Sequence, residues 1–544
     1  MPLKNKPVPM PEKRVTFKNG ANGTIYVYYT VRAYRNKAGK PTSDEAAIGK
    51  KDNATGQLIP NRRYYEFFPD AETPHKDSKP LSLPVSLPKS VRSCGNTAAL
   101  LKTAGDIGLT EILKKCFPDR WNRILATAFY ILCQGNVMMY IEDWFDETDV
   151  KFTERMDDID CSKLFASISD EDKKRFFKEW VKYINEREYI AYDVSSVSAY
   201  SGNIDIAEWG YNRDREKLPQ MNIGMYYGMT SHIPVYYDLY SGSIPDKTYM
   251  EFMMTTAKDL GICDVCFVID RGFVKKDNLV YMHENKIEFI TALPGNRLEA
   301  LRLIDENKSN IRKSANRIGE YEVYGIKQDI ELDGVPMQAH IYYDPEKQAF
   351  DEKELYAHIE KLQAELEKMS HTKRLTKKYK DYFVIDEKQK DDFAFEINAD
   401  KLDEKLERAG FFILLSNKQE LSSRDVLSIY RTRDTVEKSF DQLKNRLDFK
   451  RMRTHWNKTA QGKMFVGFLA LILRSVMLRK IKENAQTKHL TFEKILIELR
   501  KIKAVSLTDM SDILLPLTKL QKTILSVLDV SKDGLLAPFE VSIL

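Results

Sequence analysis

Two aspartates stand at the ends of short apolar runs, where their carboxylates could act together. Asp193 closes the run Tyr189–Asp193, and Asp270 follows the run Asp264–Ile269. Ligands and catalytic groups gather at the carboxyl ends of strands in α/β sheets, so we expect the two side chains to converge. Carboxylate oxygens are ligands that Mg²⁺ prefers. A chance pair of strand-terminal aspartates would look the same, so a third feature is needed to distinguish a metal site from coincidence.

The third feature is a carboxylate on a helix predicted over residues 423–447. At about 3.6 residues per turn, Arg433 and Glu437 share one face of this helix. Tyr430 and Lys444 lie two turns to either side of Glu437 and join the same stripe. An exposed ion pair would account for Arg433 and Glu437 alone, but it does not explain the tyrosine and the lysine.

The elements around the two aspartates indicate how the carboxylates are held. From residue 188 onward the pattern predicts three strands, then helix, strand, helix and strand. The predicted segments are Tyr189–Asp193, Asn222–Met229, Ile233–Leu239, Thr248–Leu260, Asp264–Ile269, Lys275–Asn285 and Ile287–Leu293. This order is the signature of an RNase H-like α/β core, in which helices cover a mixed sheet.

The chain of 544 residues is too long for one ordinary core, so several domains are expected. Changes in composition and periodicity set the boundaries. We predict a basic β-rich module at 1–68, a proline-rich linker at 69–94, a helical region at 95–187, the first part of the core at 188–295, a β-rich insertion with an amphipathic helix at 296–410, the second part of the core with the Glu437 helix at 411–455, and a C-terminal helical region at 456–544.

Positive charge is concentrated at the N-terminus. Residues 1–68 hold 13 Lys/Arg and 5 Asp/Glu, whereas the whole chain has a net charge of +5. Such a module suits a polyanionic partner. The basic residues that alternate with tyrosines, and could contact phosphates or a groove, are Arg32, Arg35, Lys37, Arg62 and Arg63. An ordinary small sheet with a solvated charged face is the alternative.

Cysteine usage and hydropathy favour a reducing cytoplasm. Six scattered cysteines are too few for a disulfide scaffold. Cys263 and Cys266 form the only close pair, and two buried strand cysteines explain this pair better than a zinc site does. The longest apolar stretch, Met464–Leu478, is interrupted by Gly467 and Arg474 and falls short of a membrane span. No signal peptide is expected.

Taken together, the motifs resemble the bacterial DDE transposases of the insertion-sequence-four superfamily, and the long-protein branch is the most similar. The hallmark of that family is the Tyr-Arg-Glu-Lys helix. Further matching segments are Tyr192–Ser196, Ala207–Arg213, Leu218–Asn222, Pro234–Tyr237, Asp270–Phe273 and Val436–Phe440. The resemblance, which spans about residues 95–480, implies that Asp193, Asp270 and Glu437 are the catalytic triad and the metal ligands. It also implies that an insertion at 296–410 is tolerated.

The resemblance implies cut-and-paste transposition, with DNA cleavage followed by 3′-hydroxyl strand transfer. Two Mg²⁺ ions per active site are expected, Mn²⁺ should substitute, and Asp193 should bridge both ions. The implied partners are double-stranded DNA, at the terminal inverted repeats and at the target, and a second copy of the chain. The helical region 95–187 is then expected to bind DNA or to dimerise. The side chains expected to hold phosphates are Tyr430, Arg433, Lys444, Arg446, Lys450, Arg451 and Arg453.

Two other functions remain open. One is an RNase H-like nuclease without strand transfer, and the other is an inactive DNA-binding descendant of a transposase. The nearby Asp214 and Asp246 are not expected to bind metal, and Asp246 is expected to cap a helix. Trp209 and Trp456 are expected to pack against the protein rather than to stack on an extruded base. The bacterial cytoplasm is the expected location.

Overall fold

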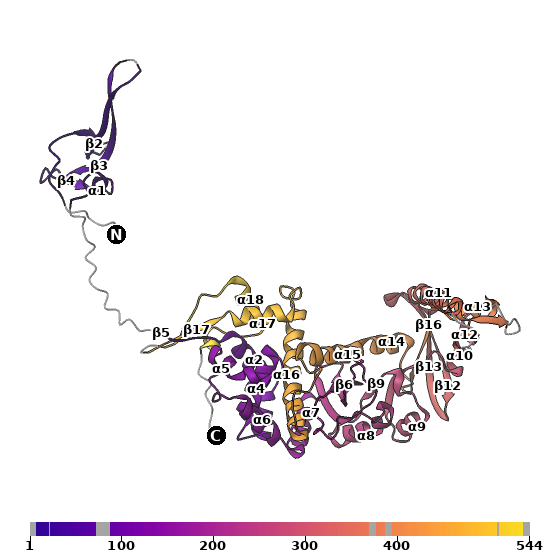
Figure 1. Cartoon of the computed structure of the whole chain (residues 1–544). Coiled ribbons are helices and arrows are strands. Elements are labelled where there is room, and N and C mark those ends of the chain that lie inside the picture. Colours follow the sequence, from indigo (N-terminus) through magenta and orange to yellow (C-terminus); the bar gives the residue numbers. More distant parts are fainter. Residues whose placement is uncertain are drawn as a thin grey trace. The chain divides into compact units, whose positions relative to one another are not determined.

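The computed structural model describes residues 7–20, 22–37, 39–71, 88–368, 377–386, 394–508 and 511–536. The mixed α/β chain falls into two compact units, Met1–Leu87 and Pro88–Leu544 (Figure 1). Each unit has its own hydrophobic core. Residues 72–87 of the predicted linker lie outside the described residues. The end of that segment, Pro88–Ser93, forms strand β5.

The N-terminal unit is an antiparallel sheet with the strand order β1-β2-β3-β4. Its elements are β1 (Val15–Asn19), β2 (Ile25–Arg35), β3 (Pro41–Lys51), β4 (Leu58–Pro60) and α1 (Tyr64–Phe67). β-branched and aromatic residues favour these strands. Gly39, with a φ of +73°, stands in the turn between β2 and β3. The buried core consists of Val27, Ile48, Leu58 and Tyr64, so most of the unit's basic side chains lie at its surface.

The larger unit is built on a nine-stranded mixed sheet with helices on both faces (Figure 1). In spatial order the strands are β11 (Arg317–Ile318), β12 (Val323–Leu332), β13 (Val335–Tyr343), β16 (Phe411–Ser416), β10 (Glu288–Leu293), β9 (Cys266–Ile269), β6 (Tyr189–Ser198), β7 (Gln220–Gly228) and β8 (Pro234–Ser241). β10, β9 and β6 run parallel, and the other neighbours are antiparallel. The predicted elements between residues 188 and 293 are confirmed, including helices α8 (Asp246–Asp259) and α9 (Lys276–Glu284).

Part of the segment predicted as an insertion, 296–410, is continuous with this sheet. β13 pairs with β16 over Gln338–Tyr343, so β11, β12 and β13 extend the sheet. Periodicity does not reveal this, because a buried strand reads alike whichever strands flank it. The other elements of the segment are α10 (Leu298–Asn307), α11 (Pro345–Glu367), α12 (Lys377–Lys380), β14 (Phe383–Asp386), β15 (Ala394–Ile397) and α13 (Ala399–Glu407). α11 contributes Ile359 and Leu362 to a separate small core.

The helix predicted over 423–447 is interrupted. α14 (Ser423–Thr432) and α15 (Asp434–Asp441) meet at Arg433, and the last turn, Gln442–Arg446, is π-helical. A π turn closes i→i+5 hydrogen bonds, so residues within and beyond it rotate away from the stripe of a regular α-helix. No proline or glycine stands in this stretch, and the sequence therefore gives no sign of the interruption.

Helices form most of the remainder of the larger unit. The helix α16 (Asn457–Glu483) is buried along most of its 27 residues and packs on α4 and α6. The other helices are α2 (Gly95–Asp106), α3 (Leu109–Cys116), α4 (Trp121–Gln134), α5 (Ile141–Glu147), α6 (Asp158–Ser167), α7 (Asp170–Ile184), α17 (Phe492–Arg500) and α18 (Lys519–Val527), with 3-10 turns at Met138–Tyr140, Arg271–Phe273, Ser314–Asn316, Gly319–Tyr321 and Asp533–Leu535. In the part of the chain that the structure describes, no single helix is long and apolar enough to span a membrane, and one pair bent by 103°, Trp121–Gln134 with Met138–Glu147, passes by length and composition only.

The C-terminal region, predicted as helical, also contains strands. β17 (Lys503–Leu507) pairs with β18 (Ile513–Leu514) and with β5. The pairing of β17 with β5 joins segments that lie some 400 residues apart in sequence. Local periodicity carries no information about such a distant partner, which explains why both strands were missed.

Replacing Gly462 of α16 with alanine should destabilise the larger unit. A Cβ atom there would lie 2.0 Å from the backbone oxygen of Phe165 in α6. Overpacking of this kind typically costs about 1–3 kcal/mol, so calorimetry should show a Tm lowered by several degrees. Gly105→Ala is the matched control, because its Cβ would meet nothing within 4 Å. An unchanged Tm for Gly462→Ala would contradict the close packing of α16 on α6.

Candidate active site

The register of the sheet brings Asp193 and Asp270 side by side. β6 and β9 are parallel, and Tyr192 pairs with Ile269, so the next residue in each segment is an aspartate. Asp193 does not end its strand as predicted, because β6 continues alongside β7 after β9 has ended. Asp270 follows β9 directly, and its carboxylate accepts a hydrogen bond from the backbone N–H of Gly272 at 3.2 Å.

Strand alternation directs Asp193 to the face of the sheet that α15 covers. Met225, the β7 partner of Asp193, is contacted by the Ser439 hydroxyl of α15 at 3.7 Å. Ser195, two residues after Asp193, accepts a hydrogen bond from Lys444. Residues two apart in a strand share a face, so these contacts place the Asp193 carboxylate beneath the helix that carries Glu437.

The positive charges near the Asp193 carboxyl do not offset the cost of burying it. The residue is 6% exposed, and its Oδ1 accepts a hydrogen bond from the backbone N–H of Val194 at 2.8 Å. The Arg213 Nη1 lies 3.6 Å from the same oxygen. Burial raises the pKa of Asp193 to about 6, although Arg213 and Arg433 both lower it. Burial therefore outweighs the two arginines together.

One guanidinium joins three carboxylates. The Arg433 Nη2 lies 2.6 Å from Glu437 Oε1 and 3.5 Å from Asp270 Oδ1. The Arg433 Nη1 lies 3.9 Å from Asp193 Oδ2. The three acids come from β6, from the residue after β9 and from α15. The structure thus brings all three predicted acids to a single cation.

The Arg433 guanidinium is buried but incompletely satisfied. Its side chain is 10% exposed, and its Nε and Nη1 have no hydrogen-bond partner within the described residues. It lies over the Tyr430 ring, 5.4 Å from the centroid. Burial lowers the pKa of Arg433, but Tyr430 and the three carboxylates raise it by more. Burial also raises the pKa of Tyr430 to about 12, so the arginine is charged and the phenol is neutral at physiological pH.

The three acids offer oxygen donors alone, which is the ligand set of Mg²⁺ and Mn²⁺. As the side chains are placed, no three His, Cys, Asp or Glu residues among those described lie close enough together to hold a metal ion. The Arg433 guanidinium stands where the acids converge, with two nitrogens unsatisfied. The donor set and its charge fit a divalent cation, and entry of that cation requires Arg433 to turn aside.

Lys444 lies buried beside the sheet rather than on the exposed stripe. Its Nζ is 2.6 Å from Asp214 Oδ2 and donates to Ser195 Oγ at 3.1 Å. The Lys444 side chain is 8% exposed, whereas that of Glu437 is 52% exposed. Lys444 lies within the π-helical turn Gln442–Arg446, whereas Glu437 lies in α15. Through its contacts with Asp214 and Ser195, Lys444 ties the loop of Asp214 to β6.

Arg213 is a site residue that the sequence analysis missed. Besides contacting Asp193, it places Nη2 3.0 Å from Asp246 Oδ2. Asp246 also accepts a hydrogen bond from the Tyr240 hydroxyl at 2.9 Å. The predicted capping role of Asp246 is wrong, because Pro245 occupies the N-cap position of α8. The available signal was an arginine in the loop directly after the strand of Asp193, but the path of a loop cannot be read from local patterns.

Residues 185–473 match the model of the transposase DDE domain. This match covers more than half of the chain and includes the three converging acids. The chain belongs to the DDE transposase family. No curated protein matches the sequence. Among the solved structures that match is a cryo-EM structure of a piggyBac transposase synaptic complex with hairpin DNA, with 11% identity and a TM-score of 0.33 over 75% of this chain and 76% of that chain. A likeness this distant does not identify equivalent residues.

The basic residues that follow Lys444 in this transposase are each paired with an acid. The pairs are Arg446–Glu493, Lys450–Glu216, Arg451–Glu216 and Arg453–Asp448, with N–O distances of 3.8, 3.7, 2.8 and 3.1 Å in that order. The basic side chains are 42% to 53% exposed. Exposed ion pairs of this kind are weak.

The remaining predicted residues belong to the N-terminal unit or to connecting segments of the larger unit. Arg32, Arg35, Lys37, Arg62 and Arg63 belong to the N-terminal unit and are all exposed. The packing predicted for two tryptophans is wrong, since Trp209 is 67% exposed and Trp456 is 63% exposed. Both stand in connecting segments, outside the helices and strands whose periodicity predicts burial.

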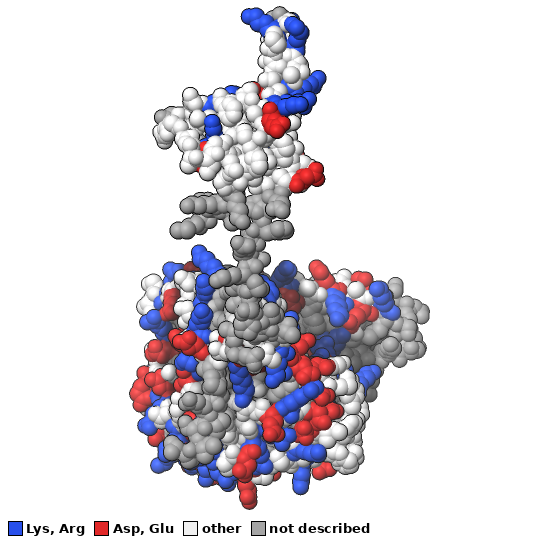
Figure 2. Space-filling model, turned by 90° about the vertical axis from the view of Figure 1, so that its left-hand side faces the viewer, with Lys and Arg blue, Asp and Glu red and all other residues white. Residues whose placement is uncertain are grey.

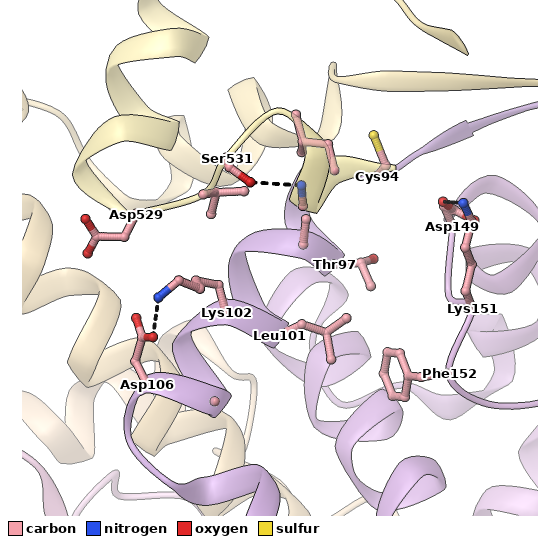
Figure 3. A pocket seen from close by; sticks show the side chains of 15 residues that line it. Cys94, Thr97, Leu101, Lys102, Asp106, Asp149, Lys151, Phe152, Asp529 and Ser531 are labelled. Carbon is pink, nitrogen blue, oxygen red and sulfur yellow. Dashed lines mark hydrogen bonds and ion pairs between the residues drawn. The ribbon is translucent and has the colours of Figure 1, made fainter. Parts of the chain in front are cut away.

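A cavity of about 400 Å³ lies elsewhere in the transposase (Figure 3). Its lining includes Cys94 and Phe152 as well as two ion pairs, Lys102–Asp106 and Lys151–Asp149. None of the three converging acids lines this cavity. It is therefore separate from the candidate active site.

Replacing Asp193 with asparagine should stabilise the metal-free transposase at neutral pH. The folded-state pKa of about 6 lies above the ordinary value of 3.8, so the folded state binds this proton more tightly than the unfolded state does. Stability must then fall as the pH rises through that window and stay lower above it. Each unit of pKa shift corresponds to about 1.4 kcal/mol, and asparagine removes the charge that causes the loss.

Thermal melts of both proteins in EDTA between about pH 3.5 and pH 8 measure this effect. The Tm of the variant should exceed that of the wild type increasingly as the pH rises from 3.8 to about 6, and the gap should then level off. A gap that is constant over the whole range would contradict the buried charge.

Proposed function

We propose that this chain is a bacterial cut-and-paste transposase of the insertion-sequence-four superfamily, long-protein branch. It cleaves DNA at the ends of its element and joins the freed 3′ hydroxyl to target DNA. The observation that carries this proposal is the convergence of Asp193, Asp270 and Glu437 on the Arg433 guanidinium. Three acids from distant segments meet on one face of the sheet, as a DDE triad must.

The order and direction of five strands support an RNase H-like core. β8, β7, β6, β9 and β10 are consecutive in the sheet. β7 is antiparallel to both of its neighbours, whereas β6, β9 and β10 are parallel. Asp193 stands on the central one of these strands and Asp270 follows the adjacent one. The proposed core combines these strands with α15, which supplies Glu437.

Asp193, Asp270 and Glu437 would hold two Mg²⁺ ions, with Mn²⁺ as a substitute and Asp193 as the shared ligand. Bound ions of this kind polarise the phosphate and stabilise charge that develops on the oxygens of the reacting bond. The chain orients its acids through fixed contacts: the Val194 N–H holds one oxygen of Asp193, and the Gly272 N–H holds one oxygen of Asp270.

Arg433 and Tyr430 would contact the DNA backbone beside the scissile bond. When Arg433 turns from the acids, its planar fork of donors matches a phosphate. The raised pKa of Tyr430 keeps its proton in place, so its hydroxyl would donate a hydrogen bond. Lys444 would reach a phosphate only by releasing Asp214, to which it is paired.

The proposed partners are double-stranded DNA, at the element's terminal inverted repeats and at the target, and a second copy of the chain. The half-exposed cations between Arg446 and Arg453 would exchange their acidic partners for phosphates. The exposed basic residues of the N-terminal unit would add to DNA affinity. A homodimer would allow two element ends to be held together.

Replacing Asp193, Asp270 or Glu437 with alanine should abolish cleavage. Each variant removes a ligand on which transition-state charge stabilisation depends, so the cleavage rate should fall by about 10³-fold or more. Cleavage of labelled duplexes that carry the element's inverted repeat measures the rate. DNA affinity, measured by fluorescence anisotropy, should change little.

The matched control for that series is Asp434→Ala. Asp434 stands on α15 three residues before Glu437 and is exposed, so its removal alters the charge of the same helix without touching the convergence point. Its cleavage rate should stay within about twofold of the wild type. Full cleavage by any of the three triad variants would exclude that residue from the site.

A precleaved end separates transposition from simple nuclease activity. The wild type, given a duplex with an exposed 3′-hydroxyl end and a supercoiled plasmid in Mg²⁺ or Mn²⁺, should form covalently joined products. EDTA should prevent joining because the acids then lack their cations. Cleavage of uncut ends without any joining of precleaved ends would favour the nuclease instead.

A further inference from the structure

The hairpin of β2 and β3 extends beyond the rest of the N-terminal sheet. β1 pairs with β2 only over Ile25–Tyr29, and β4 pairs with β3 only over Gly49–Lys51. The distal halves, Thr30–Arg35 and Pro41–Glu45, pair with each other. They form a two-stranded ribbon, which has no further strand at either edge among the described residues.

The ribbon is rooted in the small core of the unit. Val27 of β2 and Ile48 of β3 are fully buried at its base. Tyr29 packs on Phe67 and Phe68, with ring centroids 5.3 Å apart in both contacts. The base therefore fixes the direction in which the ribbon projects from the unit.

Positive charge gathers at the far end of the ribbon. The four basic residues are Arg32, Arg35, Lys37 and Lys40, all exposed. Figure 2 shows Lys and Arg side chains clustered at the end of this unit. Of the two acids of the ribbon, Asp44 lies opposite Arg32 in the strand pairing and accepts a hydrogen bond from the Tyr34 hydroxyl at 3.2 Å, and Glu45 pairs with Lys18 at 2.8 Å.

The four ribbon cations differ from the basic residues near the catalytic acids. None of the four forms an ion pair with a carboxylate of the described residues, whereas Arg446, Lys450, Arg451 and Arg453 are all paired. The Arg35 guanidinium donates instead to the backbone oxygen of Gly39 at 2.9 Å, which braces the turn. The four cations of the ribbon are therefore not held in ion pairs within the described parts of the chain, and the pairing of β2 with β3 fixes where they lie.

The dimensions of the ribbon favour the major groove of DNA. Five residues of extended strand span roughly 17 Å. The major groove, about 12 Å wide and about 8.5 Å deep, admits a two-stranded β-ribbon, whereas the minor groove is only about 6 Å wide. The lysines and arginines at the tip and sides of the ribbon, which form no ion pairs with described residues, complement the phosphates along the two sides of the major groove.

We propose that the β2–β3 ribbon enters the major groove of double-stranded DNA and supplies a principal anchor for the transposase. The inference rests on the proposed function for the identity of the partner, and it adds which element binds and which groove it occupies. Arg32 and Arg35 are three positions apart in β2, so they lie on opposite faces of the ribbon. Lys37 and Lys40 flank the turn between β2 and β3, which is the part of the ribbon that would enter the major groove first.

The test compares two charge-matched variants of the full-length chain. Lys37→Gln/Lys40→Gln removes two charges from the ribbon, and Lys353→Gln/Lys361→Gln removes two exposed charges from α11. Fluorescence anisotropy with a labelled 40-base-pair duplex of mixed sequence gives the affinity of each protein over a series of salt concentrations. The ribbon variant should bind at least tenfold more weakly, and its log–log salt slope should be smaller by about two. The control variant should lose less than a third of that effect, and Lys37→Arg/Lys40→Arg should bind like the wild type.

Groove-selective competitors test the location. Saturating methyl green, which occupies the major groove, should reduce the affinity ratio of wild type to ribbon variant toward one, whereas netropsin in the minor groove should leave it unchanged. Two results would overturn the ribbon proposal while leaving the transposase assignment intact. One is an equal loss of DNA affinity in both charge-matched variants, and the other is an affinity ratio of wild type to ribbon variant that falls to one with netropsin but not with methyl green. Failure of the wild type to bind duplex DNA, or binding only to anionic phosphatidylserine vesicles, would overturn both.

Discussion

The candidate active site depends on the balance of charge on one face of the central sheet. The parallel register of β6 and β9 fixes Asp193 and Asp270 as neighbours, and burial makes the Asp193 charge unfavourable enough to raise its pKa to about 6. Glu437 adds a third carboxylate from α15. The Arg433 guanidinium is paired with all three carboxylates. Its hydrogen bonding is incomplete, because two of its nitrogens have no hydrogen-bond partner among the described residues.

The excess of negative charge extends to the residues around the three acids. Arg213 links Asp193 to Asp246, and Lys444 holds Asp214. Five carboxylates therefore stand against three cations: Asp193, Asp214, Asp246, Asp270 and Glu437 against Arg213, Arg433 and Lys444. An excess of acid on a partly buried surface is unfavourable unless another cation joins it. This excess is a physical reason, independent of family resemblance, to expect divalent ions here.

The sequence predicted those features of the site that depend on residues close together in the chain. Apolar runs ending in Asp193 and Asp270 predicted adjacent strand ends, and the helical spacing of Arg433 and Glu437 predicted a shared face. The two aspartates do lie side by side, although β6 continues beyond Asp193, and Arg433 and Glu437 form the expected ion pair. The sequence could not predict the π turn that contains Lys444, because no proline or glycine marks it. It also could not predict Arg213, the sheet extension by β11–β13 or the β5–β17 pairing, since each depends on residues that meet only in the folded chain.

The two groups of basic residues differ in a way that divides their roles. Cations near the acids are already paired, so DNA that binds there must first displace carboxylates, and little net affinity is gained from each exchange. Cations on the β2–β3 ribbon form no ion pair among the described residues, so in the proposed complex a phosphate that contacts them would displace counterions rather than a paired carboxylate. Affinity should then come mainly from the N-terminal unit, and the interactions of the larger unit remain available for the transition state. An enzyme gains rate only from contacts that are stronger in the transition state than in the bound substrate. A catalytic surface with prepaired cations and a separate anchor with free ones satisfies that requirement.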